Sequence, residues 1–204
     1  MNYQRMLNGA LAGVSAGQRL GKESSSSTKR YPVGQGQTVV TPLPDTIEGI
    51  EFQIDKMAEY VREYSGHPDV VKFARELVRN AKAQDLTAEA KNVYKYLLAH
   101  TRYVRDPSKR ELIQTPELMV RDMRETGLTQ GDCDELATLT ATLLEAIGHS
   151  TRFIFGAFDL GWQHVWVEDL DAKNKKGLML DLAERLPLGK VLSFDMYGAY
   201  PIWQ

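Results

Sequence analysis

The sequence predicts an α+β fold in which a helical N-terminal half is followed by an antiparallel sheet. Between residues 45 and 148, apolar residues recur at the 3.6-residue spacing of amphipathic helices. After residue 148 the pattern changes to an alternation of period two, in β-branched and aromatic runs separated by polar or glycine-containing turns. Helices first and strands afterwards are typical of a domain with a mostly antiparallel sheet.

Residues 1–45 differ from the rest and are predicted to be an N-terminal arm, ahead of one domain at 46–204. Four glycines recur in the arm at every fourth position, at Gly9, Gly13, Gly17 and Gly21. On a helix they would form a smooth stripe for close packing. The SSSST run at 24–28 and the glycine- and proline-rich segment behind it favour a flexible arm instead. Both interpretations stay open: a flexible arm, or one that orders on a protein partner or another copy of the chain.

Five helices are expected after the arm. They cover residues 45–61, 67–83, 87–104, 116–127 and 133–148. Pro68 suits a first helical position, Thr87 is a plausible cap, and Gly127 ends the fourth helix. The fifth helix has little polar face, so we expect it at the centre of the domain. The runs TRFIFGAF, HVWVEDL and GLMLDLA are then predicted as strands, with KVLSFDM as a candidate fourth.

The composition excludes several classes of protein. The chain has 204 residues, of which 43% are hydrophobic and 25% charged, as in ordinary globular domains. A net charge of −2 gives no reason to expect nucleic acid, and no run of about 20 apolar residues predicts a membrane span. The single cysteine forms no internal disulfide, which suits a cytoplasmic protein, or a virion protein if a phage encodes the chain.

That cysteine, Cys133, stands at the start of the central helix, between Asp132 and Asp134. A buried cysteine is most often a small hydrophobe. In the first turn of a helix, however, unpaired backbone N–H groups and the positive end of the dipole lower a thiol pKa and favour thiolate. The two flanking acids oppose this effect unless they point away.

A nucleophilic thiol needs a base and an orienting acid. Three histidines, at 67, 100 and 149, are interpreted as surface or capping residues, whereas His164 opens a predicted strand. Asp181 follows an apolar run, so a buried carboxylate there would need a donor such as His164; a solvated acid is the alternative. A metal site built from Cys133, His164 and Asp181 is disfavoured, because zinc sites with one cysteine and no close ligand pair are uncommon.

Four blocks in order, GDCDELATLTATLLEAIG, TRFIFGAF, HVWVEDL and LMLDLA, resemble the core of the transglutaminase-like superfamily of papain-type cysteine enzymes. The resemblance is to small bacterial and phage members and covers about residues 45–185. It implies a papain/transglutaminase-like fold, with Cys133 as nucleophile, His164 as base and Asp181 as orienting acid. Gln114 is the expected side-chain donor to the oxyanion, and a loop-capping role is equally open. Family members often follow the L-D strand with proline, whereas LAERLPLG stands here.

The resemblance implies acyl transfer through a thioester, with a peptide or protein as substrate. A cysteine protease or amidase is the first hypothesis. A protein-crosslinking transamidase would use the same triad, and a phage-virion or other assembly protein could keep the fold without the chemistry. No cofactor is expected, and nothing in the sequence resembles the calcium-binding loops of large animal transglutaminases, so no metal is expected either.

Overall fold

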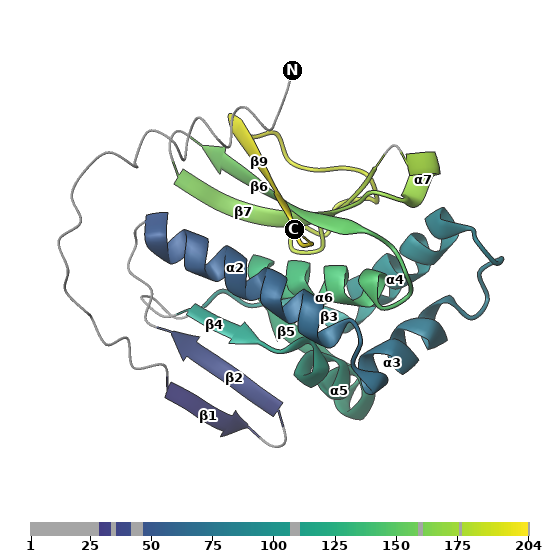
Figure 1. The fold of residues 1–204 in the computed structure, drawn as a ribbon, viewed down its shortest axis with the longest axis horizontal. Coiled ribbons are helices and arrows are strands. Elements are labelled where there is room, and N and C mark those ends of the chain that lie inside the picture. The colour runs from purple at the N-terminus through teal and green to yellow at the C-terminus, as the bar shows by residue number, and fades with distance from the viewer. Residues whose placement is uncertain are drawn as a thin grey trace.

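A layer of helices packs against one face of an antiparallel sheet (Figure 1). The structure is a computed structural model, and it describes residues 29–33, 36–41, 47–106, 111–158, 161–175 and 177–203. The predicted α+β class is confirmed, with most of the described helices preceding the larger sheet. None of the described helices combines the length and the apolar composition that a bilayer-spanning segment requires.

The helices of the described chain come mostly before the larger sheet, and the last one lies between two of its strands. They are α2 (Ile47–Tyr64), α3 (Pro68–Val78), α4 (Leu86–His100), α5 (Pro116–Thr126), α6 (Cys133–Glu145) and α7 (Ala172–Lys175). The strands are β1 (Lys29–Val33), β2 (Gly36–Thr41), β3 (Thr101–Tyr103), β4 (Glu111–Gln114), β5 (Thr129–Gly131), β6 (Thr151–Phe158), β7 (Gly161–Asp169), β8 (Leu178–Leu180) and β9 (Met196–Pro201). The order in the larger sheet is β8-β7-β6-β9, and all its pairings are antiparallel.

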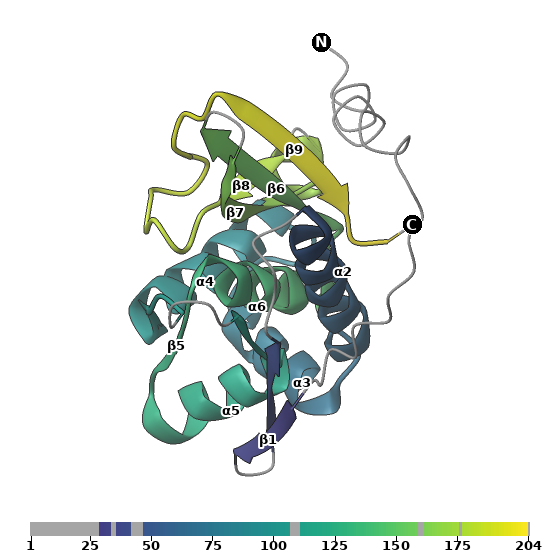
Figure 2. The same cartoon turned by 90° about the vertical axis from the view of Figure 1, so that its left-hand side faces the viewer.

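Helix α6 is central, as predicted. Every residue from Glu135 to Leu144 is buried, and the helix lies between the sheet and the other helices (Figures 1 and 2). The buried threonines at 138, 140 and 142 donate their hydroxyls to carbonyls four residues earlier, at 2.7 Å in each case, which satisfies these groups inside the core. Truncating Leu143, which is fully buried, would cost roughly 2–5 kcal/mol of stability.

The two faces of the sheet carry different clusters. Phe153, Phe155, Val165 and Val167 face the helical core, whereas Ile154 and Trp166 on the other face pack with Phe194. Of the candidate fourth strand at 190–196, residues 190–195 are not a strand: β9 begins only at Met196 and pairs with β6. The backbone N–H of Asp195 donates to Ala157 O, and the segment before it places the Phe194 ring on the outer face instead of extending alongside the sheet.

Part of the predicted N-terminal arm forms strands. β1 and β2 pair with each other, and β2 pairs with β4, in an antiparallel sheet on the side of the helices away from the larger sheet (Figure 1). The stripe of glycines from residue 9 to 21 lies outside the described residues. The boundary at residue 45 stays a prediction.

The first turn of α4 differs from the prediction. Asp85, not Thr87, caps the helix by accepting a hydrogen bond from the backbone N–H of Ala88 at 3.0 Å. Thr87 instead accepts a hydrogen bond from the backbone N–H of Lys173 at 2.8 Å. The hydroxyl thereby ties α4 to α7.

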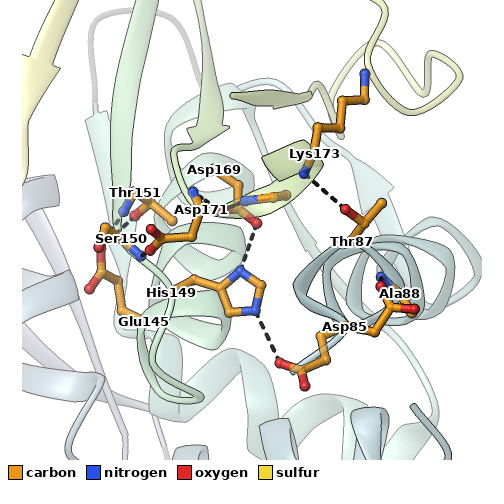
Figure 3. Close-up of polar contacts among 12 residues, drawn as sticks. Asp85, Thr87, Ala88, Glu145, His149, Ser150, Thr151, Asp169, Asp171 and Lys173 are labelled. Atoms are coloured by element: carbon orange, nitrogen blue, oxygen red, sulfur yellow. Dashed lines mark hydrogen bonds and ion pairs between the residues drawn. The ribbon is translucent and has the colours of Figure 1, made fainter. Parts of the chain in front are cut away.

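A buried histidine links the helical layer to the end of the sheet. His149 is 2% exposed, and its Nδ1 lies 2.7 Å from Asp169 Oδ2 at the end of β7 (Figure 3). Its Nε2 lies 3.2 Å from Glu89 Oε2 on α4. Its interpretation as a surface or capping residue is wrong, because carboxylates distant in the sequence enclose it. Burial by itself lowers the pKa of this imidazole, but the hydrogen bonds and charges of Asp169 and Glu89 outweigh burial and raise the pKa.

We predict that His149→Ala destabilises the protein by about 3 kcal/mol, because it leaves two acids without their shared partner. Because the pKa of His149 is higher in the folded than in the unfolded protein, the histidine stabilises the fold fully at pH values below its unfolded pKa of about 6.5. This stabilisation is lost as the pH rises through the folded pKa. The gap in unfolding free energy between wild type and variant should therefore narrow from pH 6 to pH 9 in urea titrations. His100→Ala is the matched control, because His100 has no carboxylate partner among the described residues. A gap that is independent of pH would contradict this account.

Candidate active site

A capping box fixes the start of α6. The Asp132 carboxylate accepts a hydrogen bond from the backbone N–H of Asp134 at 3.0 Å, and Glu135 Oε2 accepts one from the backbone N–H of Asp132 at 2.7 Å. Gly131 precedes the box because a Cβ there would lie 2.7 Å from Glu135 Oε2 and 2.8 Å from Glu135 Cβ. The local sequence thus places Cys133 at the first helical position, as predicted.

The thiol of Cys133 lies between an acid and strand β7. Its S–H donates to Asp134 Oδ1 at 3.5 Å, and the backbone N–H of Val165, the residue after His164, donates to the sulfur. Burial, the charges of Asp134 and Asp132, and the bond to Asp134 together raise the thiol pKa well above its usual range, against the lowering effect of Val165. The predicted lowering of this pKa is wrong, because the flanking acids do not point away. The resting group is therefore a protonated thiol.

His164 and Asp181 form a buried pair. Nε2 of His164 lies 2.9 Å from Oδ2 and 3.0 Å from Oδ1 of Asp181. The histidine is 8% exposed and the aspartate 1%, so the alternative of a solvated acid is wrong. Oδ1 also accepts a hydrogen bond from the backbone N–H of Glu184 at 3.2 Å. Since Nε2 is held by the carboxylate, Nδ1 is the ring nitrogen left for chemistry.

Gln114 ends β4 beside the start of α6. Its Nε2 donates to the backbone carbonyl of Gln130 at 3.0 Å and lies 3.4 Å from Glu135 Oε1. These contacts join β4 to β5 and to the capping box, which agrees with a loop-capping role. The role of Gln114 as oxyanion donor stays a prediction.

Two aromatic rings contact the imidazole and each other, and the sequence reasoning missed them. Trp166 stacks with His164 at a centroid distance of 5.7 Å, and Phe194 does so at 5.9 Å. Phe194 lies over Gly156, which is opposite His164 in the β6–β7 register, and a Cβ at Gly156 would be 2.5 Å from the ring. Glycine in the middle of this strand therefore marks the close approach of another group. Gly156 was therefore the sequence signal that could have indicated a ring packed close to this strand.

Tyr103 was also missed. It ends β3 and is 48% exposed. Burial of the side chain, the thiolate that Cys133 forms at high pH and the carboxylate of Asp132 raise its pKa to about 12. The phenol thus lies within electrostatic range of the thiol and stays protonated at neutral pH, so that it is available as a hydrogen-bond donor.

Acidic groups gather next to the thiol. Ligand atoms of Asp106, Asp132 and Glu135 lie within 4.8 Å of one another, and so do those of Asp132, Cys133 and Asp134. Carboxylate oxygens are the ligands that hard cations prefer. Burial and the charge of Asp132 raise the pKa of Glu135 to about 9, so at neutral pH a proton on Glu135 already relieves much of the repulsion. That the protein needs no metal stays a prediction.

Comparisons with known proteins agree with the sequence resemblance. The family model of the transglutaminase-like superfamily matches residues 71–176, which is 106 of the 204 residues and ends before Asp181. The comparison with curated proteins found no match.

Several solved structures are similar in fold. A candidate protease from Parabacteroides distasonis is 15% identical, with a TM-score of 0.48, over 63% of this chain and 25% of its own. A candidate cysteine protease from Cytophaga hutchinsonii is 13% identical, with a TM-score of 0.46, over 79% of this chain and 54% of its own. LapG from Legionella pneumophila, in an EGTA-treated form, is 18% identical, with a TM-score of 0.45, over 72% of this chain and 78% of its own. The chain thus spans only part of the first two proteins.

The environment of the thiol predicts a high pH midpoint for its alkylation. Because Cys133 is the one cysteine, iodoacetamide reports on it alone. We expect a midpoint above the ordinary thiol value of about 8.5. Asp134→Asn should lower the midpoint by roughly one unit, because it removes a negative charge next to the sulfur. Asp69→Asn, an exposed acid on α3, is the control. A wild-type midpoint below 8.5, or no shift in Asp134→Asn, would refute this description of the site.

Proposed function

Since the chain belongs to the transglutaminase-like superfamily, we propose that it is a cysteine amidase or protease that cleaves peptide bonds through a thioester intermediate. The observation that carries the proposal is the buried His164–Asp181 pair. His164 lies on β7 directly before Val165, whose backbone N–H bonds the Cys133 sulfur, and Asp181 follows β8. A nucleophile, a base and an orienting acid are the three groups that acyl transfer by a thiol requires.

In the proposed mechanism, Nδ1 of His164 takes the thiol proton as Sγ attacks the carbonyl carbon of the substrate. The C–S bond forms, and the carbonyl oxygen takes up the negative charge. The C–N bond then breaks, the imidazolium gives its proton to the departing amine, and a thioester remains. A water molecule, deprotonated by His164, attacks the thioester and releases the carboxylic acid and the free thiol. Asp181 stabilises the imidazolium at each stage through its 2.9 Å contact with Nε2.

General-base activation agrees with the raised thiol pKa. Asp132 and Asp134 disfavour a thiolate that forms before substrate binds. As the sulfur attacks, its charge moves to the carbonyl oxygen, where donors can stabilise it. The backbone N–H of Cys133 is one proposed donor, because it lies in the first turn of α6. Gln114 is the other, and it would serve by exchanging its 3.4 Å contact with Glu135 for the oxyanion.

Transamidation would use the same residues with an amine in place of water as the acceptor. No described residue distinguishes the two acceptors, and none points to a virion or another assembly role. Hydrolysis, with water as the acceptor, is the reaction proposed.

We predict that substitutions in the triad abolish amide cleavage without unfolding the protein. Cys133→Ala should remove activity completely, and Asp181→Asn should reduce kcat by about 10²–10⁴-fold, because the imidazole loses its orienting charge. The measurement is mass spectrometry of a peptide library digested by each variant, with circular dichroism to verify the fold. His100→Ala, on the exposed side of α4, is the matched control. Equal cleavage by wild type and Cys133→Ala, or none by wild type, would reject the proposed function. Isopeptide products with an added amine would indicate transamidation instead.

A further inference from the structure

An open pocket of about 440 Å³ lies next to the candidate site, between the end of α4, strand β3 and the loop that follows Asp181. Its apolar walls include Leu98 and Leu128. Its polar lining consists chiefly of Arg102, Tyr103 and Arg185. The mechanism proposed above uses none of these side chains.

The pocket is positively charged. The guanidinium of Arg185 donates to the backbone carbonyl of Thr101 at 3.3 Å and to that of Leu98. These carbonyls hold the group in place but do not neutralise it. Neither Arg185 nor the exposed Arg102 is paired with a carboxylate in the described part of the chain. Two guanidinium groups that have no carboxylate partner among the described residues, placed around apolar walls, are suited to a carboxylate on a short aliphatic stem.

The pocket and the thiol share Tyr103. Tyr103 lines the pocket, and its hydroxyl is within electrostatic range of Cys133, Asp132 and Asp134. Arg105 partly offsets these acids on the same side. β3 also pairs in parallel with β5, which leads through Asp132 into the thiol-bearing helix. The charge therefore changes sign from one side of Tyr103 to the other, from acids at the sulfur to arginines in the pocket.

We propose that this pocket is a substrate subsite for the carboxylate of an aspartate or glutamate side chain. The proposal rests on the proposed function, because it assumes that the peptide attacked by Cys133 lies along β3. Asp132 and Asp134 repel a carboxylate at the reacting carbonyl, whereas Arg102 and Arg185 attract one that is held further along the peptide. The site thus selects peptides with an acidic residue set back from the bond that is cleaved.

The test compares two alkylating reagents that differ only in charge, iodoacetyl-Gly-Glu-amide and iodoacetyl-Gly-Gln-amide. The ratio of their rates at Cys133 is independent of the thiol pKa, because both react with the same sulfur. We expect the glutamyl reagent to react about three- to tenfold faster with wild type, as exposed arginine–carboxylate pairs allow. Arg102→Gln and Arg185→Gln should each lower the ratio towards one, and high salt should do the same. Arg75→Gln, an exposed arginine on α3, should leave the ratio unchanged.

A wild-type ratio at or below one, or a ratio retained in both pocket variants, would overturn the subsite. This measurement needs no turnover, so it is separate from the proposed function. Cleavage of library peptides without an acidic preference would reject the subsite and leave the amidase proposal standing. An absence of cleavage, with the reagent ratio above one and sensitive to both arginines, would reject the amidase and leave a carboxylate-binding pocket beside the thiol.

Discussion

The buried carboxylate of Asp181 is the constraint on which the site depends. A carboxylate that is 1% exposed must find donors, and it finds them in His164 and in the backbone N–H of Glu184. The hydroxyl of Tyr94, on α4, lies 2.6 Å from the backbone carbonyl oxygens of both Asp181 and Leu186, which share its one proton. Strand β7, the loop after β8 and the helical layer are thereby joined at one residue.

The start of α6 combines two opposing electrostatic effects. The helix terminus favours negative charge, yet Asp132 and Asp134 lie close enough to raise the thiol pKa. Keeping the sulfur protonated has a chemical consequence, because oxidation and alkylation require thiolate. A thiol of this kind reacts little with adventitious electrophiles and, in the proposed mechanism, depends on His164 to take its proton. The same acids place negative charge on one side of Tyr103, with the arginines of the pocket on the other.

Much of the fold and part of the site could be predicted from the sequence, because both depend on local patterns. The change of period after residue 148 predicted the sheet, and the apolar character of α6 predicted its central position. The pairing of His164 with Asp181 followed from the cost of burying an acid. His149 and Phe194 could not be placed, because their partners are distant in the sequence. The direction of the thiol pKa depended on where the neighbouring carboxylates point, which spacing does not determine.

The central claim is that the thiol and the His164–Asp181 pair act as one unit. Nitrogen-15 NMR of the histidine rings tests it directly, before and after Cys133 is converted to its methyl disulfide. Because Asp181 holds Nε2, blocking the sulfur should shift the Nδ1 resonance of His164 strongly and the Nε2 resonance little, while both resonances of the distant His149 stay unchanged. If neither His164 resonance moves, the imidazole does not contact the sulfur, and the account is contradicted.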